Sequence, residues 1–148
     1  MIKNYTSTVP AIRSISYIEQ TLIEHGATSI IKVCENQRIK GINFFINVDG
    51  KSMPFHLPAK IEEVERILRE QIKRPRDDTL ARISEQAERT SWKLISDWID
   101  IQMTFIDLGQ AEILEVFMSY YVVNMKTSQT LFEKMKSNGF AMLEDKSK

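Results

Sequence analysis

Basic side chains gather in one part of this sequence, around the segment KRPR at residues 73–76. Ammonium and guanidinium groups that converge in space bind phosphate, and a guanidinium fork matches two phosphate oxygens at once. On helices, Arg82, Arg89 and Lys93 would share one face, and Arg69 and Lys73 would share another. If the chain folds back at KRPR, these charges meet. The sequence therefore predicts a phosphate-binding site made of Arg69, Lys73, Arg74, Arg76, Arg82, Arg89 and Lys93.

Acidic residues are interleaved with these cations, which leaves a second interpretation open. Glu70, Asp77, Asp78 and Glu85 lie among them, and Glu85 precedes Arg89 by one helical turn, in the order that favours an ion pair. Runs of mixed charge usually form a solvated surface. The alternative is therefore a face of internal ion pairs that binds no ligand.

The other ionisable residues form no catalytic set. Asp97 and Asp100 could share a helix face, but a site for Mg²⁺ or Ca²⁺ needs more oxygen ligands. His25 and His56 have no neighbour at ligand spacing, and Cys34 has no nearby His or Asp to activate it. The glycines are isolated, so there is no glycine-rich phosphate loop. We predict no catalytic residue, metal or cofactor, and we leave an enzymatic activity as the less favoured option.

Asp97 stands out because it lies next to Trp98, beside the apolar seam of a long predicted helix. A carboxylate buried there must have a hydrogen-bond partner. We expect a lysine, a Trp indole or a Tyr hydroxyl. The prediction is a structural or subunit-bridging role for Asp97 in preference to catalysis.

The long helix, over residues 79–108, is the element around which the basic residues are arranged. It contains no Pro or Gly before Gly109, and Leu80, Ala87, Leu94 and Ile101 mark a seam with a seven-residue repeat. From Trp92 onward a second apolar stripe joins the first. We therefore predict that this half pairs with a second copy of the chain, through Trp92, Ile95, Trp98, Ile99, Phe105 and Ile106. The aromatic residues could instead stack on bases in a ligand groove, but helical spacing favours a core or interface role.

The rest of the chain predicts an α+β fold. We expect a helix over 13–25, strands over 28–34 and 39–48, and a third strand carrying Met53, Phe55 and Leu57, joined to the second by an Asp49-Gly50 hairpin. Pro54 places the third strand at an edge of this antiparallel meander. A covering helix over 60–73 follows, and the long helix then forms a C-terminal hairpin with a helix over 110–123. A short last helix is capped by Ser128. We predict one domain over 1–148, with an α/β layer (1–73) and a helical layer (79–143).

Composition limits the choice of setting and partners. The 148 residues carry 20 basic and 20 acidic side chains, so no overall field attracts nucleic acid or membranes. No segment approaches a membrane span or a signal peptide, and a single cysteine is ordinary in a reducing compartment. We expect a cytoplasmic protein that has no membrane partner.

The stretch EQAERTSWKLISDWIDIQMTFIDLGQAEILEVFMSY, preceded by KRPRDDTLARI, resembles a group of small proteins encoded in bacteriophage and prophage genomes. The resemblance extends to the opening NYTSTVP and to the meander. It rests on the spacing of Trp, Gln and acidic residues along helices, and it includes no catalytic signature. The resemblance implies a setting, the bacterial host cytoplasm during infection or lysogeny.

These observations lead to two hypotheses about function. The first is a non-enzymatic accessory binding protein of phage type, homo-oligomeric, that grips a nucleotide or nucleic acid at the KRPR junction and modulates host functions. The alternative is a protein-interaction module that inhibits or recruits a host protein through its helical surface.

Overall fold

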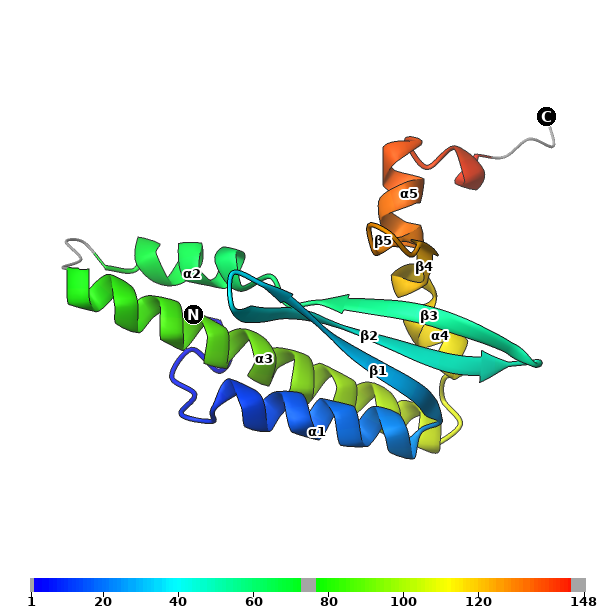
Figure 1. The fold of residues 1–148 in the computed structure, drawn as a ribbon, viewed down its shortest axis with the longest axis horizontal. Coiled ribbons are helices and arrows are strands. Elements are labelled where there is room, and N and C mark those ends of the chain that lie inside the picture. Colours follow the sequence, from blue (N-terminus) through cyan, green and yellow to red (C-terminus); the bar gives the residue numbers. More distant parts are fainter. Residues whose placement is uncertain (1, 73–76, 145–148) are drawn as a thin grey trace.

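A computed structural model describes residues 2–72 and 77–144 of the chain, with the side chains of residues 77 and 78 excepted. Helices and strands follow in the order α1 (Ala11–Glu24), β1 (Ala27–Glu35), β2 (Arg38–Val48), β3 (Lys51–Pro58), α2 (Ile61–Glu70), α3 (Asp77–Asp107), α4 (Ile113–Phe117), η1 (Met118–Tyr120), β4 (Val122–Asn124), β5 (Gln129–Thr130), α5 (Leu131–Ser137) and η2 (Ala141–Leu143). The predicted α+β class is confirmed. Figure 1 shows α1 and α3 side by side, while α5 stands away from this helical layer.

The sheet is the antiparallel meander that the sequence predicts, in the order β1-β2-β3. Asp49 and Gly50 have φ angles of 51° and 80°, as the predicted tight hairpin requires. The β1–β2 turn, at Asn36 and Gln37, has the same left-handed geometry. Pro54 lies on β3, which is an edge strand, and on its free side Tyr121 forms a single bridge to Phe55.

The core lies between one face of the sheet and the two long helices. Phe44 and Phe55 are paired across β2 and β3, and their rings stack with centroids 5.3 Å apart. Phe117 of α4 meets the Phe44 ring edge-on at 5.2 Å. Burying such rings supplies much of the free energy that holds a small core together. The same core cluster includes apolar residues of α1 and α3, chiefly Ile15, Ile18, Leu22, Trp92, Ile99 and Met103.

The helix α3 is unbroken over 31 residues, a length of about 46 Å. Its seam is covered in only one half: Ile83 and Ala87 are buried where α2 packs on α3. Farther along, Ile101, Phe105 and Leu108 are 50 %, 44 % and 69 % exposed. We call these three residues the exposed stripe.

The predicted interface needs a correction at Trp92 and Ile99. Both side chains are fully buried in the core of a single chain, so neither can contact a second copy. Ile95, Trp98 and Ile106 are half-buried against the same core. The second apolar stripe therefore packs in the core of its own chain. Of the six predicted interface residues, Phe105 belongs to the exposed stripe.

The predicted helix over 110–123 is also corrected. Only Ile113–Phe117 is α-helical, and it is followed by the turn η1 and the strand β4. The chain does turn back at Gly109, where φ is 74°, and it reaches Trp98 through edge-on contacts from Phe117 and Tyr120. The helix stops early because Tyr121 pairs with the sheet edge instead. Thr130, in a capping box with Glu133, caps α5; the predicted cap, Ser128, has a left-handed φ of 56°.

Replacing the buried ring that joins α4 to the sheet tests this packing. Phe117→Ala should lower the free energy of unfolding by about 3–5 kcal/mol, because it opens a cavity between three aromatic rings. Phe132→Ala, on the half-exposed face of α5, is the matched control, and its effect should not exceed about 1 kcal/mol. Urea denaturation measures both, and equal losses would contradict the assigned core.

Candidate functional site

Three of the four predicted phosphate-binding residues that the structure describes are engaged within the chain. Arg69 pairs with Glu65 at 2.6 Å, and Lys93 pairs with Asp97 at 3.0 Å, in each case one helical turn away. Arg89 donates to the Ser7 carbonyl oxygen at 3.3 Å and to Gln86 at 2.7 Å. These contacts match the alternative of internal pairing. Lys73, Arg74 and Arg76 lie outside the described residues.

The structure does bring two of the predicted cations to one place. Arg82 and Arg89 line a cleft of about 570 Å³ between α2 and α3, which also contains Glu85 and Tyr5. Arg69 and Lys93 do not line this cleft. Arg82 and Arg89 share a face of α3, as predicted, but no described cation of α2 joins them in this cleft.

Asp97 has a lysine partner, which is one of the hydrogen-bond partners that the sequence predicts for it. Lys93 pairs with one carboxylate oxygen, and Asn4 donates to the other at 2.8 Å. Burial acts to raise the pKa of Asp97, but the hydrogen bonds from Asn4 and Lys93 outweigh it and hold this pKa below its ordinary value. The carbonyl oxygen of Asn4 also accepts from Thr90 at 2.8 Å. Asp97 thus helps to fasten the N-terminal arm to α3.

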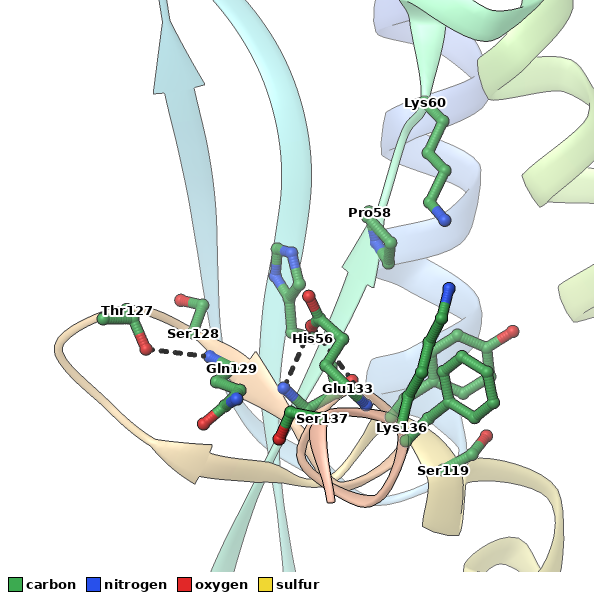
Figure 2. Close-up of a pocket in the computed structure, with 13 residues that line it drawn as sticks. His56, Pro58, Lys60, Ser119, Thr127, Ser128, Gln129, Glu133, Lys136 and Ser137 are labelled. Carbon is green, nitrogen blue, oxygen red and sulfur yellow. Dashed lines mark hydrogen bonds between the residues drawn. The ribbon is translucent and has the colours of Figure 1, made fainter. Parts of the chain in front are cut away.

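A larger hollow opens beside the end of β3, and Figure 2 shows the residues that line it. Its volume is about 1000 Å³, and its walls come from the end of β3, η1, the β4–β5 loop and α5. The lining residues with polar or aromatic groups include His56, Lys60, Tyr120, Ser128, Glu133 and Lys136. We call this hollow the lysine pocket.

Lys60 and Lys136 extend their ammonium ends into the same space, one from the β3–α2 junction and the other from α5 (Figure 2). Within the described part of the chain, neither lysine forms an ion pair. By contrast, Lys40 on the neighbouring strand pairs with Glu62, and Lys32 pairs with Glu19. The lysine pocket therefore presents two positive charges whose counter-ions are not supplied by the described side chains.

One wall of the lysine pocket is a hydrogen-bonded chain across the sheet. The side-chain oxygen of Asn43 accepts from His56 Nδ1 at 2.5 Å, and the Asn43 amide donates to Ser128 at 3.3 Å. His56 lies so close to Gly41 that a Cβ there would be 2.7 Å from the ring. Glycine at position 41 therefore lets the imidazole lie flat against β2. This chain anchors the β4–β5 loop to the sheet.

The charge state of His56 follows from its surroundings. Burial lowers the pKa of His56, and the nearby Glu133 carboxylate opposes this by raising it. Glu133 itself is held by α5, since its Oε1 accepts from the backbone N–H and the hydroxyl of Thr130. With Nδ1 donating to Asn43, a neutral His56 ring keeps an unprotonated Nε2.

The arrangement is suited to binding more than to covalent chemistry. Ser128 is hydrogen-bonded to Asn43, not to His56, so the hydroxyl has no adjacent base. The other histidine, His25, contacts Asp107 at 2.9 Å and the Thr21 carbonyl oxygen. Within residues 2–72 and 77–144, no three His, Cys, Asp or Glu side chains are placed to hold a metal ion. No helix in those ranges is long and apolar enough to span a membrane.

Comparisons of the chain with protein-family models, with curated proteins and with solved structures found no match. The phage and prophage setting therefore remains an expectation based on the sequence resemblance.

Sequence reasoning missed Lys60 and Lys136. Each lysine lies near the end of an element, and nothing in its local pattern distinguishes it from a surface residue. The signal that unites them is tertiary, because the β4–β5 loop must first dock on the sheet. Local charge density pointed instead to KRPR.

The neutral state of His56 predicts a pH dependence of stability. Below pH 6.5 the unfolded chain binds a proton at His56 that the folded chain resists, so stability should fall as the pH drops from 7.5 through 6.5 to the lowered folded pKa. Thermal denaturation of the wild type and His56→Gln over this range measures the effect. The fall should shrink in His56→Gln but persist in His25→Gln, and an unchanged fall in His56→Gln would contradict the assignment.

Proposed function

We propose that this protein is a non-enzymatic accessory protein that binds a phosphate-bearing ligand, either a nucleotide or a nucleic-acid strand, in the lysine pocket. The observation that carries the proposal is that the ammonium groups of Lys60 and Lys136 point into one hollow, and that neither has an ion-pair partner among the described residues. The ligand class is the one that the sequence predicts. The proposed site therefore differs from the KRPR site: it is formed at Lys60, which precedes α2, and at Lys136 of α5.

The physical argument is one of charge. Two cations that face each other repel, and a polyanion between them removes this repulsion while it gains two charge-assisted hydrogen bonds. The hydroxyl groups of Ser119, Thr127 and Ser137 line the same space and can donate to further phosphate oxygens. Among the described residues, Glu133 is the one carboxylate that lines the pocket, so the two lysines leave an excess of positive charge there. These features favour an anion over a cation.

We further propose that the protein acts as a homo-oligomer in a bacterial host cytoplasm, where it modulates host functions. The exposed stripe supports pairing, because it continues the apolar seam of α3 beyond the part that α2 covers. The covered part ends beside the first turn of α2, and from there no described helix covers the seam. An apolar helix face of this kind is the usual site of a symmetric contact. The proposed interface therefore consists of Ile101, Phe105 and Leu108, in place of the buried Trp92 and Ile99.

The same stripe supports the alternative function. If the protein is a module that inhibits or recruits a host protein, Ile101, Phe105 and Leu108 would contact that host protein in place of a second copy. The lysines would then serve solubility alone. Ligand binding and oligomeric state separate the two functions.

Replacing both pocket lysines tests the ligand site. Lys60→Ala with Lys136→Ala should weaken tripolyphosphate binding at least about 100-fold, since each charge-assisted contact contributes about 1.5–3 kcal/mol. Lys134→Ala, on another face of α5, is the matched control and should bind like the wild type. Isothermal titration calorimetry measures the change.

Loss of binding in Arg74→Ala with Arg76→Ala, together with normal binding in the pocket variant, would return the site to the KRPR junction. Salt dependence then identifies the ligand type. A steep loss of affinity for an oligonucleotide with salt indicates a strand, and a weak dependence with one small molecule per pocket indicates a nucleotide.

The exposed stripe predicts the oligomeric state. Light scattering at micromolar concentration should give at least twice the 17.2 kDa of one chain, and Phe105→Glu should give the single-chain mass, because it places a charge in the apolar contact. Ile12→Glu, at an exposed apolar position of α1, is the matched control and should keep the larger mass. A wild-type mass of 17.2 kDa would contradict pairing and favour the host-protein alternative.

A further inference from the structure

A second hollow adjoins the lysine pocket. It has a volume of about 460 Å³ and lies between α2, α3 and η1. Pro58, Lys60 and Tyr120 line both hollows, so the two spaces meet at Lys60. The walls of the second hollow are mainly apolar, from Leu57, Val64, Leu94, Ile95 and Trp98, and they also include Glu63, whose carboxylate pairs with Arg66. We call it the aromatic pocket, because Trp98 and Tyr120 stand together in it with ring centroids 5.7 Å apart.

The aromatic pocket also contains a buried polar atom without a partner. Ser91 is only 4 % exposed, and its hydroxyl makes no hydrogen bond to any described residue. Such groups are rare in folded proteins because desolvation costs free energy that a hydrogen bond normally offsets. Ser91 lines the pocket wall, and because its hydroxyl is itself inaccessible, the serine side chain must turn toward the pocket before a ligand can supply the missing partner.

The combination of flat rings, aliphatic walls and one hydroxyl selects among anionic ligands. An acyl chain would satisfy the apolar walls but would leave the Ser91 hydroxyl unpaired. A bare polyphosphate would leave the whole pocket empty. A heterocyclic base has a flat face for Trp98 or Tyr120 and polar ring atoms for the serine hydroxyl.

We propose that the ligand is a free nucleotide whose base occupies the aromatic pocket while its phosphates lie between Lys60 and Lys136. This inference rests on the proposed function, and it narrows that function from any phosphate-bearing ligand to a mononucleotide. Lys60 stands where the two pockets join, so a single nucleotide can reach both. Trp98 and Ser91 determine which base is accepted, and the two lysines hold the phosphates.

The test compares ligands that share the phosphates and differ in the base. Calorimetry at constant ionic strength, with the intact wild-type chain, uses ATP, GTP, CTP, UTP and tripolyphosphate as probes. At least one nucleotide should bind about tenfold more tightly than tripolyphosphate, because base stacking adds to the phosphate contacts. That nucleotide should also quench tryptophan emission, whereas tripolyphosphate should not. The quenching should disappear in Trp98→Phe, since the remaining tryptophan, Trp92, is fully buried.

A conservative change at the serine tests the polar contact. Ser91→Ala should weaken the best nucleotide by about three- to tenfold and leave tripolyphosphate binding unchanged. Ser96→Ala, equally buried on α3 but outside the aromatic pocket, is the matched control and should not alter nucleotide affinity. Equal melting temperatures of the two variants exclude a folding effect.

The outcomes separate the inference from the proposed function. If tripolyphosphate binds and none of the four nucleotides binds more tightly, the base site is wrong and the phosphate site stands. If a single-stranded oligonucleotide binds tightly while no nucleotide binds more tightly than tripolyphosphate, the base site is likewise wrong and the phosphate site stands. If neither the nucleotides, tripolyphosphate nor the oligonucleotide binds, the proposed function is itself overturned.

Discussion

The helix α3 has more apolar surface than any single neighbour can cover, and this constraint organises the rest of the molecule. One flank is covered by α1, to which α3 is tied by hydrogen bonds from Tyr17 to Asp100 and between His25 and Asp107. The first half of the seam lies under α2. The returning segment after Gly109 covers Trp98. The start of α2 and the end of η1 lie close together, and the two pockets lie there: Lys60 is the N-cap of α2, and Tyr120 ends η1.

The outer face of the sheet completes the lysine pocket. Alternation along β2 and β3 sends Phe44 and Phe55 into the core and their neighbours Asn43 and His56 to the other side. There the Asn43 amide holds Ser128, which fixes the loop between β4 and β5. The helix α5 follows directly, and its capping box at Thr130 sets the direction in which α5 leaves the sheet. The position of Lys136 depends on this series of contacts.

Elements with strong local signals were predictable. The Asp49-Gly50 turn, the alternation of β2 and the heptad spacing of α3 each specify their structure within a few residues, and the structure confirms them. The predicted interface was wrong at Trp92 and Ile99. Periodicity shows that a helix face is apolar, but it does not show whether the same chain covers that face. The predicted helix over 110–123 was wrong because Tyr121 pairs with β3, which prevents the helix from continuing through it. Of the cations in the predicted KRPR site, Arg69 and Lys93 pair with carboxylates one turn away, while Lys73, Arg74 and Arg76 lie outside the described residues. Lys60 and Lys136 meet only through tertiary structure.

The central claim is that phosphate binds between Lys60 and Lys136, and a footprint of every lysine in the chain tests it most directly. The intact protein is acetylated briefly with and without tripolyphosphate, and the modification of each lysine is counted by mass spectrometry. The account predicts that tripolyphosphate protects Lys60 and Lys136 together and leaves Lys134 unchanged. Protection at Lys73 with none at Lys60 and Lys136, or no protection anywhere, would contradict it.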